Sequence, residues 1–145
     1  MKSKILVICT GNSCRSQMAE AYLRHESEKL KIDVAVFSAG IEAHGVNPKV
    51  IQVLKADEID ISKHTSNKIE DYLNCGITHV ITVCDHANEH CPIFPKKVKS
   101  THHNFTDPTK ATGSIESINY AFEKTREEIK SFCKKYLLNN FNNEL

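Results

Sequence analysis

The sequence predicts an α/β fold, in which a parallel sheet is covered by helices on both faces. Short apolar, β-branched runs alternate with longer segments of helical period, an order typical of strand–helix–strand units. The chain has 145 residues, enough for one domain with a sizeable core. It contains no internal repeat, low-complexity segment or linker that would divide it. We therefore expect a single three-layer domain over residues 1–145.

The first part of the chain gives two strands and two helices. The run KILVI, Lys4–Ile8, is typical of a buried strand, and Ser16–Leu30 after it has a helical composition. A second strand is predicted over Val34–Ser38. Asn47 is followed by proline, which indicates a helix N-cap and a first helical residue. This helix is expected to run to about Ala56.

The second part continues the alternation. Ser66 is predicted to cap a third helix over Ile69–Cys75, which a glycine then ends. Strands are expected over His79–Cys84 and, more briefly, Lys97–His102. Fraying is expected over the Asn-rich end, Leu138–Leu145. The last helix before it carries an apolar stripe at three- and four-residue steps: Ile115, Ile118, Phe122, Ile129, Phe132 and Tyr136.

The loop between the first strand and the first helix is predicted to bind an anion. Cys9 and Arg15 enclose five residues, and Ser16 completes the pattern Cys-x5-Arg-Ser. The enclosed residues are Thr10, Gly11, Asn12, Ser13 and Cys14. Backbone N–H groups and a helix N-terminus attract an oxyanion, and Arg15 adds a forked, permanent charge. The same field favours the thiolate of Cys9. Cys9 is thus predicted to attack a phosphate-like oxyanion, although a cysteine here could also simply pack in the core.

Composition and charge limit the partners, the cellular location and the use of the cysteines that we expect for this protein. Charged residues make up 26% of the chain and the net charge is +1, so nothing indicates a nucleic-acid or membrane partner. The apolar run Ile5–Ile8 is far too short for a signal peptide or a transmembrane helix, so we expect a cytoplasmic protein. In a reducing cytosol, its six cysteines are expected to be catalytic or redox-active rather than structural.

Two further cysteines suggest a redox switch. Cys84 and Cys91 lie seven positions apart, a rise of about 10.5 Å along a helix. A disulfide needs Cα atoms about 4.4–6.8 Å apart, so a bond between them requires this segment to leave any helical conformation. If the strands before Cys9 and Cys84 are neighbours, about 4.8 Å apart, these two cysteines can also meet. A relay from Cys9 to Cys84 to Cys91 then follows by thiol–disulfide exchange.

Two alternatives to the relay are open. Cys84, His86, His90 and Cys91 cluster and could hold a metal, although their spacing matches no usual zinc pattern. The two cysteines could also be unrelated. Asp107, followed by proline in a loop before the last helix, could protonate a leaving oxygen, or could simply form a turn.

Five separated segments together resemble one known family. They are CTGNSCRSQMAEA, FSAGIEAHGVNPK, DISKHTS, VCDHANEHCP and FTDP. In order and spacing they resemble the thioredoxin-coupled arsenate reductases, which share the low-molecular-weight tyrosine phosphatase fold. The resemblance runs from about Lys4 to Gly113 and implies a four-stranded parallel sheet in the strand order 2-1-3-4. It also implies a role in arsenic detoxification.

The resemblance implies roles for four residues in or beside the anion loop and for Asp107. Cys9 would be the nucleophile that bonds arsenic, and Arg15 would clamp the oxyanion. Ser16 would hydrogen-bond the Cys9 thiolate, and Asn12 would shape the loop. Asp107 would protonate the leaving hydroxide.

The resemblance also implies the redox steps and the partners. Cys84 would attack the Cys9–arsenic adduct, releasing arsenite and leaving a Cys9–Cys84 disulfide. Cys91 would then produce a Cys84–Cys91 disulfide for thioredoxin to reduce. Arsenate would be the substrate, with phosphate and sulfate as mimics, and we expect a monomer.

No cofactor is expected to be required, but some members of this family bind a potassium ion near the anion loop. Asn12, Glu20 and Ser38 match the positions of its ligands. Asn67 stands where a ligand aspartate would be expected, and the lost negative charge should weaken binding of a cation.

The main alternative function is a low-molecular-weight protein tyrosine phosphatase that uses Cys9, Arg15 and Asp107. Gln17 stands where such phosphatases usually have proline, and Thr109 stands where they usually have tyrosine. Both departures speak against this alternative, although weak activity on aryl phosphates is expected. A third possibility is a non-enzymatic anion- or metal-binding module.

Overall fold

The computed structural model describes residues 2–141 and contains one parallel sheet in the order β2-β1-β3-β4, as predicted. The strands are β1 (Ser3–Cys9), β2 (Val34–Gly40), β3 (His79–Thr82) and β4 (Lys99–His102). The α-helices are α1 (Arg15–Leu30), α2 (Pro48–Lys55), α3 (Asp85–Glu89) and α4 (Ile115–Phe141), with 3-10 turns η1 (Ile69–Tyr72) and η2 (Pro108–Lys110). Within the described residues, no helix is both long and apolar enough to cross a membrane.

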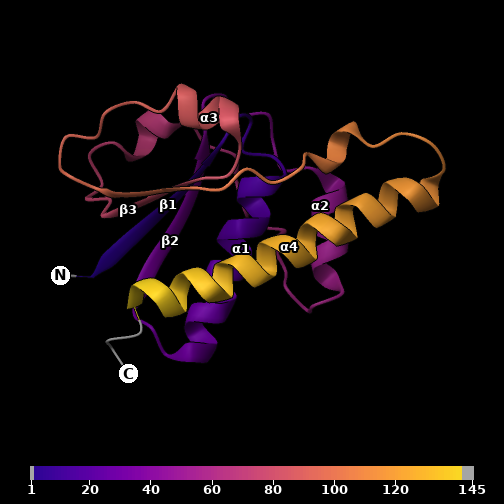
Figure 1. Ribbon diagram of the computed structural model, residues 1–145, viewed down its shortest axis with the longest axis horizontal. Coiled ribbons are helices and arrows are strands. Elements are labelled where there is room, and N and C mark those ends of the chain that lie inside the picture. Colours follow the sequence, from indigo (N-terminus) through magenta and orange to yellow (C-terminus); the bar gives the residue numbers. More distant parts are fainter. Residues whose placement is uncertain (1, 142–145) are drawn as a thin grey trace.

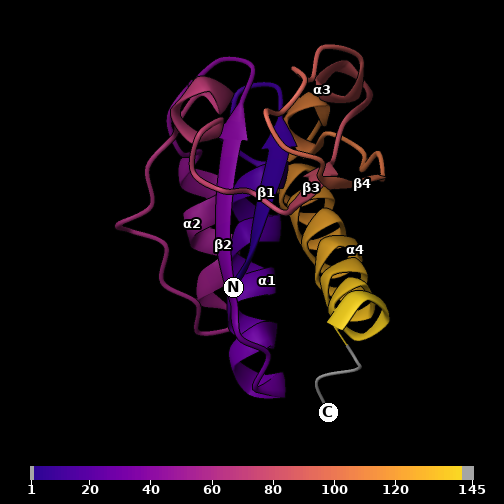
Figure 2. The ribbon, with the colours of Figure 1, turned by 90° about the vertical axis from the view of Figure 1, so that its left-hand side faces the viewer.

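The sheet lies between two unequal layers (Figures 1 and 2). Helices α1, α2 and α4 pack together on one face, while the short η1 and α3 lie on the other. The central strand β1 carries Ile5–Ile8 without any exposed surface, because both of its faces are covered. This buried strand ends at Cys9, so the core places the anion loop at the rim of the sheet.

The predicted third helix is shorter than expected and begins elsewhere. Only one 3-10 turn forms, and Lys68 rather than Ser66 precedes it. Lys68 makes an isolated parallel bridge to Gly40, which holds this segment extended beside β2. The Ser66 hydroxyl instead donates to the carbonyl oxygen of Gly11 at 3.2 Å, so it supports the anion loop.

Several element boundaries also differ from the predictions, by one or two residues at β1, β2 and the start of α1. β3 ends at Thr82 because α3 begins soon afterwards, and β4 begins at Lys99 rather than Lys97. The predicted fraying is wrong over residues 138–141, where α4 continues to the buried Phe141. The ring of Phe141 lies 4.9 Å from that of His79, and this contact anchors the helix end. Residues 142–145 lie outside the described part of the chain.

Candidate active site

The ends of two neighbouring strands bring the first pair of cysteines together. β1 pairs directly with β3, and the Val83 amide donates to the Ile8 carbonyl at 3.0 Å. This pairing meets the condition under which Cys9 and Cys84 were expected to approach each other. Their sulfur atoms lie 3.7 Å apart, and both residues are buried.

The anion loop is shaped by Asn12, whose φ of 47° lies in the left-handed region that asparagine tolerates. Its Nδ2 donates to Ser16 Oγ at 2.8 Å and to Ser38 Oγ at 2.9 Å. Its Oδ1 accepts the amide of Asn67 at 2.9 Å. The Asn12 side chain therefore ties the loop to α1, β2 and the segment before η1.

The loop surrounds a cavity of about 220 Å³. It is lined by Cys9, Thr10, Gly11, Ser13, Cys14, Arg15, His44, Asp107 and Thr109. The predicted nucleophile, clamp and acid thus face one space, together with four of the five enclosed loop residues. Asn12 does not line it, since its side chain points into the supporting network.

Arg15 is positioned from the opposite side of this cavity. Its Nη1 donates to the carbonyl of Phe105 at 2.7 Å, and its Nη2 lies 3.7 Å from Asp107 Oδ2. Asp107 caps η2, and its Oδ1 accepts from the amide and hydroxyl of Thr109 at 2.9 and 2.6 Å. The carboxylate is therefore held above the anion loop, with Oδ2 facing the guanidinium.

The cysteine pair shares one proton in this arrangement. The hydrogen bond from Cys9 lowers the pKa of Cys84 to about 5, while that bond and burial raise the pKa of Cys9. The positive charge of Arg15 lowers the pKa of both thiols. This hydrogen bond therefore favours the thiolate on Cys84, whereas the sequence predicts it on Cys9. Transfer of the shared proton across 3.7 Å exchanges the two roles.

Of the other predicted residues, Thr10 joins this pair, since its Oγ1 lies 3.3 Å from Cys84 Sγ. Ser16, Cys91 and Cys14 form no hydrogen bond with either thiol in the described part of the chain. Among the described residues, Ser16 makes no hydrogen bond to Cys9, because the Cys9 thiol points to Cys84 instead. Cys91 is half-buried beyond α3, and burial raises the pKa of its thiol. Burial likewise raises the pKa of Cys14 to about 12, which keeps it a neutral thiol.

The metal alternative gains no support from the geometry. Between residues 2 and 141, no group of three or more histidine, cysteine or carboxylate side chains could hold a metal ion. His86 and His90 stack with ring centroids 4.3 Å apart instead of converging on one point.

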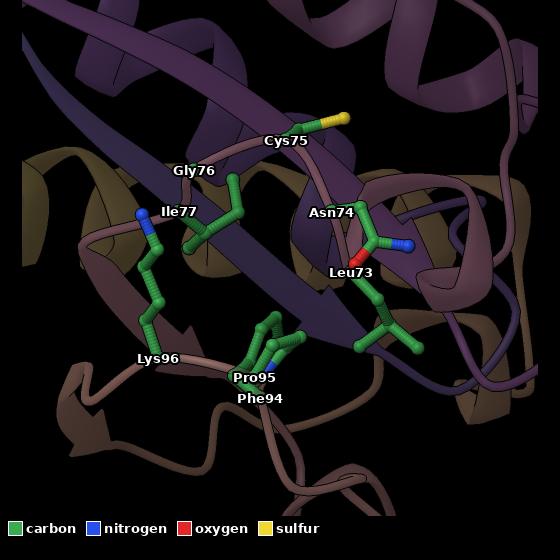
Figure 3. A pocket seen from close by; sticks show the side chains of 8 residues that line it. All are labelled: Leu73, Asn74, Cys75, Gly76, Ile77, Phe94, Pro95 and Lys96. Atoms are coloured by element: carbon green, nitrogen blue, oxygen red, sulfur yellow. The ribbon is translucent and has the colours of Figure 1, made fainter.

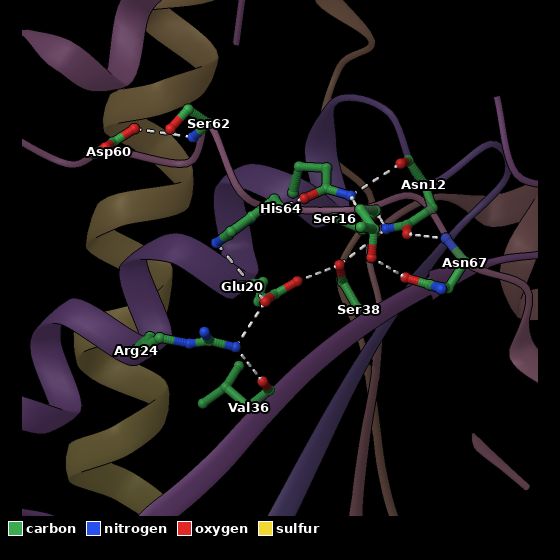
Figure 4. Close-up of polar contacts among 12 residues, drawn as sticks. Asn12, Ser16, Glu20, Arg24, Val36, Ser38, Asp60, Ser62, His64 and Asn67 are labelled. Atoms are coloured by element: carbon green, nitrogen blue, oxygen red, sulfur yellow. Dashed lines mark hydrogen bonds and ion pairs between the residues drawn. The ribbon is translucent and has the colours of Figure 1, made fainter. Parts of the chain in front are cut away.

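The residues that match a potassium site form a closed hydrogen-bond network (Figure 4). Ser38 Oγ donates to Glu20 Oε1 at 2.5 Å, and Arg24 Nη2 lies 2.7 Å from Glu20 Oε2. The same Arg24 nitrogen donates to the Val36 carbonyl at 2.6 Å. His64 Nε2 approaches Glu20 Oε2 to 3.9 Å. The single carboxylate of this cluster thus already has a cationic partner.

One cavity residue carried no signal in the sequence. His44 lies within a quoted segment, but an isolated histidine in a loop indicates no particular role. Its amide donates to the Gly11 carbonyl at 2.8 Å, and its Nε2 lies 2.6 Å from Glu42 Oε1. A Cβ atom built on Gly11 would lie 2.3 Å from His44 Nδ1, so the ring lies against the loop.

A separate hollow of about 340 Å³ contains none of the predicted site residues (Figure 3). It lies between residues 73–77 and the segment 94–96 that follows Cys91. Figure 3 shows the sulfur of Cys75 pointing away from the ring of Phe94. Cys75 is exposed and lines neither of the hollows beside Cys9 and Cys84. Its replacement is therefore a suitable control for replacement of the other cysteines.

Comparison with known proteins identifies the family. Residues 4–145 match the family described as low molecular weight phosphotyrosine protein phosphatase. The chain belongs to this family. Within it, the arsenate reductases of Staphylococcus xylosus and Staphylococcus aureus (strain N315) are each 44% identical over 137 residues, covering 94% of this chain and 98% of theirs. These relatives confirm the predicted resemblance.

Solved structures of the family agree with the fold. A structure described as an arsenate reductase in the phosphate binding state is 28% identical, with a TM-score of 0.77, and the match covers 96% of this chain and 98% of that one. The low molecular weight protein tyrosine phosphatase from T. tengcongensis is 25% identical, with a TM-score of 0.79 over 94% of this chain and 98% of its own. The family fold therefore accommodates both an arsenate reductase and a tyrosine phosphatase.

Proposed function

We propose that this protein reduces arsenate to arsenite by a three-cysteine relay that thioredoxin regenerates. The observation that carries the proposal is the pair of buried sulfur atoms 3.7 Å apart beside an anion cavity. A phosphatase of this fold needs only the nucleophile, the arginine and the acid. A second thiol within reach of the nucleophile serves a redox reaction. The arsenate reductases among its relatives support the same conclusion.

The first step forms a sulfur–arsenic bond. Arg15 and the loop amides hold the oxyanion, and Cys9 attacks as the thiolate after passing its proton to Cys84. Asp107 protonates the departing hydroxide, which leaves as water. The Cys9 sulfur and arsenic(V) are then covalently joined, with no net change in oxidation state.

The second step reduces the arsenic. Cys84, once deprotonated, attacks the Cys9 sulfur, so that the Cys9–Cys84 disulfide forms as the sulfur–arsenic bond breaks. Arsenic keeps the electron pair of the broken bond and departs as arsenite. Cys91 then attacks Cys84, frees Cys9 as a thiolate and leaves a Cys84–Cys91 disulfide. An intramolecular disulfide of this kind suits thioredoxin as the reductant.

The test is NADPH consumption with thioredoxin, thioredoxin reductase and arsenate. We expect arsenate-dependent oxidation in the wild type and in Cys75→Ser, and its loss in Cys84→Ser and Cys91→Ser. Hydrolysis of p-nitrophenyl phosphate by the same preparations tests the phosphatase alternative. Brisk hydrolysis that is indifferent to Cys84→Ser and Cys91→Ser, without arsenate-dependent turnover, would replace the reductase by a phosphatase.

We further propose that this chain works without a potassium ion because Arg24 supplies the positive charge. The cluster has only one carboxylate, Glu20, and Arg24 and Ser38 already bind both of its oxygens. Asn67 has a neutral carboxamide where a second carboxylate would be needed, and its Oδ1 already accepts a hydrogen bond from Thr65 Oγ1 at 2.7 Å. The residues present therefore do not fit a potassium ion.

A further inference from the structure

Helix α3 lies in the chain between Cys84 and Cys91, the two cysteines that form the last disulfide of the proposed relay. Its residues follow Cys84 directly, and Cys91 comes two positions after its last residue, Glu89. At about 1.5 Å rise per residue, the helical path is too long for a disulfide, so α3 must unwind before Cys84 and Cys91 can bond. So short a helix has little stability of its own, and contacts with the rest of the protein must hold it.

Side chains from β3 and β4 hold α3 at its first and fourth residues. Asp85 Oδ1 lies 2.7 Å from His102 Nε2, and Thr82 Oγ1 donates to Asn88 Oδ1 at 3.3 Å. Thr82 and His102 are register partners in the sheet, and Thr82 Oγ1 lies 2.7 Å from His102 Nδ1. The amide of Asp85 also donates to Asn104 Oδ1 at 3.2 Å. One continuous network thus joins the sheet to α3, which lies at the same end of the molecule as these strand ends (Figure 2).

We propose that Asp85 and His102 form a latch that holds α3 folded and thereby times the transfer of Cys84 from Cys9 to Cys91. The inference rests on the proposed relay. With the latch closed, the Cys84 sulfur faces Cys9 at 3.7 Å. With the latch open, α3 unwinds and Cys91 reaches Cys84. Asp85 and His102 are positioning residues, since they act through the helix and touch neither sulfur nor substrate.

The controlled step is an exchange that consumes no outside oxidant. The Cys91 thiolate attacks the Cys84 sulfur, so that the Cys84–Cys91 bond forms while the Cys9–Cys84 bond breaks. Cys9 leaves as a thiolate with the electron pair of the broken bond. Unwinding of α3 limits this exchange, because Cys91 cannot reach the sulfur while the helix is folded.

Loosening the latch is expected to move the two redox steps in opposite directions. Asp85→Ala lowers the fraction of molecules in which Cys84 faces Cys9, so arsenite release slows. The same change raises the fraction with α3 unwound, so the later exchange accelerates. A residue with a merely structural role would slow both steps together.

The decisive experiment follows one turnover with arsenate in the absence of reductant. Samples are quenched in acid, alkylated and analysed by mass spectrometry for the two disulfides, and arsenite is measured in parallel. In Asp85→Ala, we expect the lag between arsenite release and the Cys84–Cys91 disulfide to shorten roughly three- to tenfold, the scale of one partly exposed hydrogen bond to a charged group. Asp85→Asn keeps an acceptor for His102 and should shorten it less. Glu89→Ala, at an exposed position of the same helix, should leave the lag unchanged.

A second readout tests the latch without arsenate. The amides of Asn88 and His90 donate to the carbonyls of Cys84 and His86, each at 3.1 Å, so their hydrogen exchange reports folding of α3. Exchange at both amides should be faster in reduced Asp85→Ala than in reduced Glu89→Ala.

The outcomes separate the latch from the proposed function. Equal lags, or equal amide exchange, in Asp85→Ala and Glu89→Ala would overturn the latch. If arsenate fails to oxidise the wild type, the proposed function falls. The lag is then measured after oxidation of the Cys9–Cys84 pair with diamide, which accepts the two electrons in place of arsenate.

Discussion

The sulfur atoms of Cys9 and Cys84 lie 3.7 Å apart, although 75 positions separate the two residues along the chain. They meet because β1 and β3 are parallel neighbours whose carboxyl ends reach the same rim of the sheet. Arg15 lines the hollows beside both residues. One cationic side chain therefore faces both the predicted anion cavity and the thiol pair.

The shared proton gives a prediction for the pH dependence of the thiols. Because the hydrogen bond from Cys9 lowers the pKa of Cys84 to about 5, a thiolate is present above that pH and is lost as the pH falls through it. In Cys9→Ala the bond is absent, so the midpoint should move up towards the ordinary thiol value of about 8.5. Ultraviolet absorbance of the thiolate measures both titrations, with Cys84→Ser as the control that removes this signal. An unchanged midpoint in Cys9→Ala would contradict the shared proton.

Replacing the last cysteine of the relay should stop turnover after one cycle. Cys91→Ser is expected to release one equivalent of arsenite per enzyme and then stall as the Cys9–Cys84 disulfide, with thioredoxin as the only reductant. Arsenite measured after rapid mixing gives the stoichiometry, and Cys75→Ser should turn over like the wild type. Multiple turnovers by Cys91→Ser would exclude Cys91 from the relay.

Removing the general acid should slow chemistry more than binding. Asp107→Asn loses the proton for the leaving hydroxide, and we expect kcat to fall by roughly 10²–10⁴-fold. The inhibition constant of phosphate should change little, because Arg15 and the loop amides still bind the anion. Thr109→Val, which removes only the 2.6 Å hydrogen bond to Asp107, should have a smaller effect. Equal losses of kcat in the two variants would argue against proton transfer from Asp107.

Because Arg24 already pairs with Glu20, we predict that potassium does not change the thermal stability of the protein. The melting temperature of the wild type should be the same in KCl, NaCl and choline chloride at equal ionic strength. Arg24→Met should lose about 0.5–1 kcal/mol of unfolding free energy, because the pair is half-exposed. It should also gain stabilisation by KCl alone, and adding Asn67→Asp should increase this gain. Specific stabilisation of the wild type by KCl would show that potassium competes successfully with Arg24.

Gly40 is expected to be essential for the shape of the anion loop. A Cβ atom at this position would lie 2.3 Å from the Glu42 carbonyl oxygen, 2.7 Å from that of Thr10 and 2.8 Å from the Asn12 nitrogen. All three are backbone atoms, so Gly40→Ala must displace the loop. We expect a loss of about 1–3 kcal/mol in unfolding free energy and weaker binding of phosphate.

Gly11→Ala provides the contrast for this prediction. Its added Cβ would meet the ring of His44, a half-exposed side chain that can move aside. Thermal unfolding and phosphate binding should therefore be less affected than in Gly40→Ala. Wild-type stability and phosphate affinity in Gly40→Ala would contradict the predicted crowding.

Local patterns in the sequence predicted most strands and helices and the chemistry of one loop. A buried apolar run, Cys-x5-Arg and a helix follow one another directly, so the anion site could be predicted without knowing the rest of the fold. Asn47 was also recognisable, since an N-cap bonds only to its own helix and accepts the Lys49 amide at 2.9 Å. The segment after Ser66 was mispredicted because its conformation depends on the bridge between Lys68 and Gly40.

Local patterns in the sequence by themselves therefore predicted the anion loop with Cys9 and Arg15 and the succession of strands and helices, because neighbouring residues create each of these features. Only the tertiary structure decided that Cys9 and Cys84 share a hydrogen bond, that Arg24 pairs with Glu20 and that Asp85 contacts His102. Those features join residues from different elements, such as Asp85 and His102, and the packing of the sheet alone brings their side chains within hydrogen-bonding distance.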